Sequence, residues 1–167
     1  IYGYNLSTGE SNSEWTALYV GVMTNMRHII ENSESGLLRG IAMIVEAHAF
    51  GTAASLWGDI PYSEAGNTEI EDPIFDSQTN VYTSVISLLD DGISTLNSAS
   101  STPIKEDVYF NGDKDKWIAA AYTLKARFYL NQKNYANALS AAQNGINAAS
   151  GDMKFKPGNA VSGDTNL

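Results

Sequence analysis

The sequence has no cysteine, four prolines, two histidines and few basic residues. Without cysteine, the chain has no disulfide, no thiolate-ligated metal and no thiol nucleophile. Ten lysines and arginines against 19 aspartates and glutamates give a formal net charge of −9, with no basic cluster to offset it. Nucleic acid and an anionic membrane surface are therefore unsuitable partners. The uninterrupted apolar runs are far shorter than the roughly 20 residues that cross a bilayer. A chain that opens on Ile1 without a leader is expected to be a trimmed protein or an internal fragment.

The histidines do not indicate a metal or catalytic site. His48 lies in an apolar helical stripe, and the positions one turn away are Ile44 and Thr52, so no second ligand follows at helical spacing. We interpret His48 as a core residue and His28, on a polar helix face, as solvated. We expect no metal and no cofactor.

Acidic residues offer weak candidates for catalysis. The neighbouring pairs are Asp90 with Asp91, and Glu69 with Glu71. Adjacent residues on a helix point in different directions, and the glutamates lie in an exposed acidic connector, so a glycosidase is the weakest interpretation. The stretch 111–115 has calcium-like spacing but lacks the closing glutamate, and we expect a helix cap there instead.

Apolar residues recur at helical spacing in five stretches, namely 15–30, 35–57, 79–96, 113–130 and 135–146. The stretch 35–57 is apolar on nearly all faces, which predicts a place in the middle of the bundle. No convincing set of strands accompanies these helices. The sequence therefore predicts an all-α fold, a single helical domain over residues 1–167 built from antiparallel helix pairs that pack through their apolar stripes.

The last two predicted helices resemble a tetratricopeptide unit. Small residues such as Ala126 and Ala138, combined with tyrosines such as Tyr129, are typical of a helix–turn–helix in which two helices approach closely. We place this unit at about 113–149. The stripe expected to face one way in the last helix is Tyr135, Ala138, Leu139, Ala142 and Ile146.

Four segments carry motifs that follow one another in a fixed order. They are the W-x-x-L-Y-x-G-V pattern from Trp15, AHAFGTAASLWGDIPYSEA at 47–65, PIFDSQTNVYTSVISLLDDGI at 73–93, and FNGDKDKWIAAAYTLKARFYL at 110–130. Together they resemble the SusD/RagB family of outer-membrane nutrient-binding lipoproteins of Bacteroidetes. Family members are much longer, which implies that a lipid-anchored cysteine and a long C-terminal part lie outside this chain. Many members carry Arg-Ala where this chain has residues 47–49, so the role of that arginine does not transfer.

The resemblance implies a non-catalytic, lipid-anchored protein of the cell surface. Such proteins capture oligosaccharides, or in some members oligopeptides, and deliver them to a SusC-like TonB-dependent transporter. The tetratricopeptide-like helices form the side facing the transporter, and loops on another face hold the ligand. The second functional interpretation is a helical interaction scaffold that binds a protein partner and no small ligand.

By position, the candidate ligand contacts are Tyr2, Tyr4 and Asn5, in the loop before the first helix. An aromatic ring can stack on the apolar face of a sugar while asparagine bonds its hydroxyls. Alternatively, the two tyrosines pack against sequence outside this chain.

Trp57 and Tyr62, which flank the G-D-I-P turn, complete the candidate ligand-binding set. They either line a cleft or lock the turn against the bundle. We favour locking, because an irregular buried turn needs side chains that fill space and bond its backbone. Asp59, inside the turn, is expected to accept hydrogen bonds from nearby backbone amides.

Overall fold

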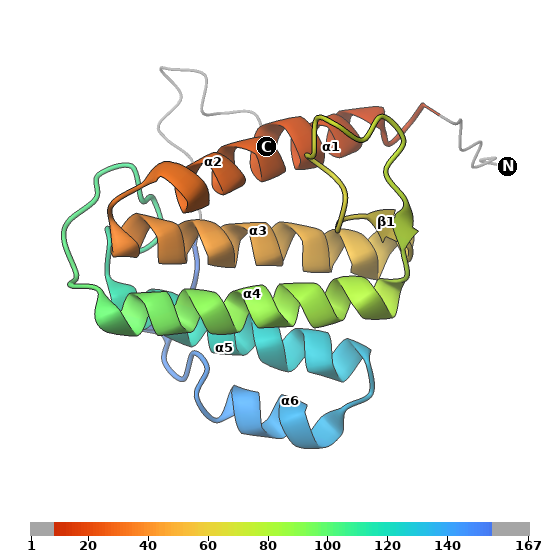
Figure 1. The fold of residues 1–167 in the computed structure, drawn as a ribbon. Coiled ribbons are helices and arrows are strands. Elements are labelled where there is room, and N and C mark those ends of the chain that lie inside the picture. Colours follow the sequence, from red (N-terminus) through yellow and green to blue (C-terminus); the bar gives the residue numbers. More distant parts are fainter. Residues whose placement is uncertain (1–8, 155–167) are drawn as a thin grey trace, which may run out of the picture.

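The computed structural model describes residues 9–154 (Figure 1). Helix α1 (Asn12–Thr16), the π-helical segment η1 (Ala17–Met23) and α2 (Thr24–Asn32) follow one another without a break and form a single rod. Four further α-helices follow within the described residues: α3 (Gly36–Trp57), α4 (Gln78–Ser98), α5 (Lys114–Asn131) and α6 (Tyr135–Ala142). A short 3₁₀ turn, η2 (Ala149–Gly151), lies near the end of the described range.

The helices lie side by side in chain order, and successive ones run antiparallel (Figure 1). Helix α3 lies between the first rod and α4, as expected from its apolar faces, and it also contacts α5. The predicted all-α fold is confirmed. Beside the helices, β1 (Ile60–Pro61) and β2 (Phe75–Asp76) form one short antiparallel pair, which the sequence did not predict.

Capping side chains begin four of the helices. Ser35, Ser77, Asp113 and Asn134 each accept a hydrogen bond from a backbone amide of the first turn of α3, α4, α5 and α6, respectively. Asp113 accepts from two amides, which confirms the helix cap expected in the stretch 111–115. Residues 9–154 contain no group of three acidic or histidine side chains able to hold a metal ion.

The core is built where α3, α4 and α5 meet. The buried residues of α5 follow helical spacing along one face: Trp117, Ala120, Ala121, Leu124 and Phe128. Gly51 of α3 lies against the ring of Phe128, which leaves no room for a larger side chain. By length and composition alone α3 could cross a membrane, but 56% of its most apolar window is buried inside the protein, as in the core helix of a soluble bundle.

Two helical predictions need correction. Helix α6 ends at Ala142 rather than near residue 146, and it packs on α5 through Ala138 and Ala141. Tyr135 and Leu139, which were expected on the packing stripe, are 65% and 64% exposed. The small side chains of Ala138 and Ala141 allow α6 to approach α5 closely. The larger side chains of Tyr135 and Leu139 then face outward.

The first rod also departs from a regular helix. Segment η1 follows the wider π-helical path, so the residues after it are rotated relative to an α-helix. Met23, the last residue of this segment, is buried at 1% exposure.

Candidate ligand-binding site

The chain turns sharply after α3. Gly58 has φ of +79°, a left-handed conformation that favours glycine, and it ends the helix. Asp59 accepts a hydrogen bond from the backbone amide of Gln78 at 2.8 Å, which ties the turn to the start of α4. The expectation that Asp59 bonds a backbone amide is therefore confirmed, although the amide belongs to a residue distant in sequence.

Tyr62 points into the protein. Its side chain is 7% exposed, its ring lies 5.0 Å from that of Phe50 between centroids, and its hydroxyl donates to Oε1 of Glu46 at 3.2 Å. Burial is the main cause that raises the pKa of Tyr62 far above its ordinary value, and the charge of Glu46 adds to it. This position favours the role of locking the turn over that of contacting a ligand.

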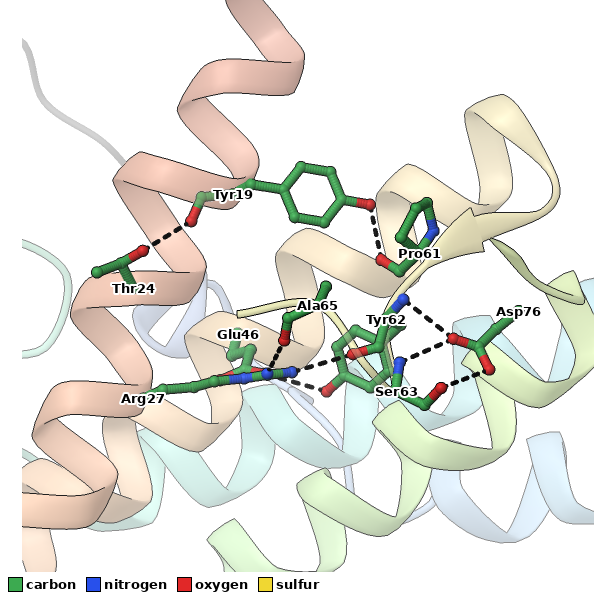
Figure 2. A network of polar contacts seen from close by, with 9 residues as sticks. All are labelled: Tyr19, Thr24, Arg27, Glu46, Pro61, Tyr62, Ser63, Ala65 and Asp76. Atoms are coloured by element: carbon green, nitrogen blue, oxygen red, sulfur yellow. Dashed lines mark hydrogen bonds and ion pairs between the residues drawn. The ribbon is translucent and has the colours of Figure 1, made fainter. Parts of the chain in front are cut away.

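An ion pair between Arg27 of α2 and Glu46 of α3 lies beside the loop that follows β1 (Figure 2). Arg27 Nε donates to Glu46 Oε1 at 3.1 Å, and its Nη atoms donate to the backbone carbonyls of Tyr62 and Ala65. Glu46 is 2% exposed, and its second carboxylate oxygen has no hydrogen-bond partner. A buried carboxylate is costly without a partner, so Arg27 compensates the charge of Glu46 on α3. Through its hydrogen bonds to the two carbonyls, Arg27 also fixes the path of the loop.

Sequence reasoning did not find this pair. The available signal was Glu46 itself, because an acidic residue in the middle of an otherwise apolar helix requires a buried partner. Which basic residue supplies that partner depends on how the first rod is rotated on α3, and the π-helical segment changes that rotation.

Asp76 fixes the loop from the other side (Figure 2). Its carboxylate accepts from the backbone amides of Tyr62 at 3.0 Å and Ser63 at 2.7 Å, and from the Ser63 hydroxyl at 2.9 Å. Partial burial raises the pKa of Asp76, but these hydrogen bonds outweigh it and leave the pKa below its ordinary value. Tyr19 donates to the carbonyl of Pro61 at 2.7 Å, and burial together with the charge of Asp76 raises the pKa of Tyr19 to about 12.

Trp57 lies at the surface. It is half-buried, and its ring meets that of Trp15 edge-on at 5.2 Å between centroids. It lines an open groove of about 420 Å³ between the first rod and α3, together with His48, Thr52 and the 71% exposed Leu56. Of the candidate ligand-binding residues, Trp57 therefore combines an accessible ring with a groove, whereas Tyr2, Tyr4 and Asn5 lie outside the described residues.

His48 is half-buried on this groove rather than fully enclosed in the core, which corrects the expectation from its stripe. Burial lowers the pKa of His48, and the positive charge of Arg127 lowers it further. Arg127 in turn donates to the hydroxyl of Thr52 at 2.7 Å. The groove thus presents a neutral imidazole near neutral pH beside an apolar wall. His28 is exposed, as expected.

The acidic residues considered for catalysis do not form a reactive pair. Asp90 forms an ion pair with Lys125, and Asp91, its neighbour on α4, is exposed. Glu69 and Glu71 are exposed in the connector between the two strands. None of these four groups has the buried, paired environment that tunes a carboxyl for acid–base catalysis.

Several solved structures that share this fold are SusD-like proteins. A SusD/RagB family protein from Bacteroides thetaiotaomicron is 28% identical with a TM-score of 0.77, over 88% of this chain and 34% of that protein. A chitin-binding protein is 27% identical with a TM-score of 0.73, over 86% of this chain and 33% of that one. A chitin-binding SusD homologue from Flavobacterium johnsoniae, 23% identical, shares the fold with a TM-score of 0.74 over 86% of this chain and 33% of its own. This chain spans about a third of the length of these relatives.

Comparison with curated proteins gave no significant match. A family model does match residues 2–162, and it describes SusD-like proteins that bind starch and associate with the outer membrane. The match includes the turn after α3, Trp57, Tyr2 and Tyr4. On this evidence, the chain belongs to the SusD-like family.

Proposed function

We propose that this chain is the helical part of a non-catalytic protein that binds glycans at the outer membrane. The observation that carries this proposal is the family match over residues 2–162, because that family is described as starch-binding. The similarity to a chitin-binding protein at 27% identity supports a polysaccharide ligand. Since the chain spans about a third of its relatives, the binding activity belongs to the longer protein.

Within the described residues, Trp57 is the proposed sugar contact. Its half-buried ring lines the groove and can stack on the apolar face of a pyranose. The His48 imidazole on the same groove can form hydrogen bonds with hydroxyls, and the Thr52 oxygen can accept one beside its bonds to His48 and Arg127. Trp15 supports the ring edge-on at 5.2 Å and so limits its movement before a ligand arrives. Tyr2, Tyr4 and Asn5 remain predicted contacts in the N-terminal loop.

The proposal includes delivery. The captured glycan, or an oligopeptide, would pass to a SusC-like TonB-dependent transporter, with the protein held at the cell surface by a lipid anchor. A protein contact at the α5–α6 side is supported by three apolar side chains that are each more than half exposed there, namely Leu130, Tyr135 and Leu139. The same surface favours the second candidate function, a scaffold that binds a protein and no small ligand.

Isothermal titration of the full-length protein with maltooligosaccharides, chitooligosaccharides and oligopeptides tests this proposal. Chromatography of the recovered ligand should follow each titration. Saturable binding with intact ligand would support capture, and hydrolysed ligand would revive the enzyme interpretation. Failure to bind any of the three at millimolar concentration would overturn ligand capture and leave the scaffold.

A further inference from the structure

A second cleft, more polar than the groove at Trp57, lies between α2 and the loop that follows β1. It has a volume of about 410 Å³, and its polar lining residues are Thr24, Arg27, His28, Glu31, Ser63 and Asn67. Its α2 residues follow the i, i+3, i+4, i+7 spacing, so they share one side of the helix. This volume is within the range of small-molecule sites.

Existing contacts hold the cleft in shape. Arg27 is fixed by Glu46 and by two loop carbonyls, and Ser63 is fixed by Asp76 (Figure 2). Gly66 has φ of +81°, and a Cβ atom there would lie 3.2 Å from Nη1 of Arg27, so the loop closes tightly on the guanidinium. A site that is ordered before binding loses little entropy when a ligand enters.

Several hydrogen-bonding groups of the cleft are left for a ligand. Arg27 has five N–H groups, and the three hydrogen bonds above leave two of them. The side-chain oxygen of Asn67 accepts from the amide of Glu69 at 3.0 Å, which leaves its NH₂ group as a donor. Glu31 offers carboxylate acceptors and Thr24 a hydroxyl oxygen. The cleft therefore offers both donors and acceptors, and a hydroxyl group can bond to either.

The charges of the cleft restrict the ligand further. Glu46 compensates the positive charge of Arg27 at 3.1 Å. Glu31, on the exposed rim, forms no ion pair with the other described residues, and the whole chain carries a formal charge of −9. An anionic ligand would therefore meet net repulsion. A neutral ligand would gain charge-assisted hydrogen bonds, because it could donate to the Glu31 carboxylate and accept from the Arg27 guanidinium.

We infer that this cleft is a subsite for a neutral sugar unit of the captured glycan, and that it discriminates against uronic acids. The inference rests on the proposed function, because it names the ligand class of the same protein. The cleft would recognise hydroxyl groups alone, whereas the groove at Trp57 also offers an aromatic ring for the apolar face of a sugar.

The test uses the full-length protein with maltotriose and triacetylchitotriose as neutral probes and trigalacturonate as the anionic one. Glu31→Ala should weaken binding of the neutral probe about 10- to 100-fold, the loss typical of a charge-assisted hydrogen bond. Asn67→Ala should weaken it about 2- to 10-fold, because the Asn67 amide forms a neutral hydrogen bond. Glu31→Lys should weaken the neutral probe and strengthen trigalacturonate. Glu34→Ala and Asn97→Ala change exposed residues outside the cleft and serve as matched controls with unchanged affinity.

The outcomes separate this inference from the function on which it rests. If a neutral probe binds the wild type and both cleft variants equally, the cleft assignment is overturned while glycan capture stands. If no probe binds the wild type, glycan capture fails and the subsite fails with it. Tighter binding of trigalacturonate than of the neutral probes would overturn the charge argument. Melting temperatures should match the wild type, because Glu31 and Asn67 are exposed.

Discussion

Replacing Arg27 with methionine tests how the turn after α3 is held. The Arg27 side chain is 30% exposed and that of Glu46 is 3% exposed, so the change leaves a carboxylate without compensation in the interior. Removing one partner of a buried ion pair typically costs about 3–5 kcal/mol. The carbonyls of Tyr62 and Ala65 also lose a donor. We expect Arg27→Met to lower the free energy of unfolding by about 3–5 kcal/mol.

Urea unfolding followed by circular dichroism measures this difference. Arg39→Met is the matched control, because Arg39 is half-buried on α3 and forms no ion pair with the described residues, and its cost should stay below about 1 kcal/mol. The double variant Arg27→Met with Glu46→Met removes both charges and should recover at least about 2 kcal/mol of the single loss. A single variant within 1 kcal/mol of the wild type, or a double variant no more stable than the single, would refute the reasoning.

Three further predictions concern the core, the groove and acid stability. Trp117→Ala should cost about 3–5 kcal/mol, because the ring is 1% exposed and its Nε1 donates to Asp107 at 2.8 Å; superimposable urea curves would show that this face is not the core. Trp57→Ala should weaken glycan binding roughly three- to tenfold with a smaller loss of stability than Trp117→Ala, and an unchanged dissociation constant would remove Trp57 from the site. Burial raises the pKa of Asp107, but hydrogen bonds from Trp117 and three backbone amides outweigh it and leave the pKa lowered. The stability that Asp107 contributes is therefore present above its unfolded pKa of about 3.9 and is lost as pH falls through the lower folded value. Asp107→Asn should flatten the loss of stability below about pH 4, and an acid limb identical to the wild type would contradict this.

The parts of the fold that could be predicted from the sequence are those that neighbouring residues determine. Ser35 begins α3 as its cap, and the buried face of α5, from Trp117 to Phe128, follows from helical periodicity alone. The same holds for the middle place of α3, since a helix without a polar face needs neighbours on all sides.

The remaining features depend on contacts between distant residues. Each strand of the β1–β2 pair has two residues, too few to show an alternating pattern. Arg27 and Glu46 belong to different helices, and the contact between them depends on the rotation imposed by η1. For the candidate site, the sequence places Trp57 and Tyr62 on either side of a turn, but only the packed structure shows that one ring lies in a surface groove and the other inside.

The position of Glu46 on α3 also bears on export, a step that the proposed function at the outer membrane requires. An exported chain crosses the inner membrane unfolded, when no other helix covers α3, whose length and apolarity resemble those of a membrane-spanning segment. In that state Glu46 is a charge without its folded-state partner in the middle of the 22 residues of α3. A charged side chain at such a position opposes insertion into a bilayer by about 2.5–3.5 kcal/mol. Glu46, which binds Arg27 in the folded protein, would therefore oppose insertion of α3 into the bilayer while the chain is unfolded. Comparing the membrane insertion of α3 segments with Glu46 and with Glu46→Leu would measure that barrier, and equal insertion of the two would disprove it.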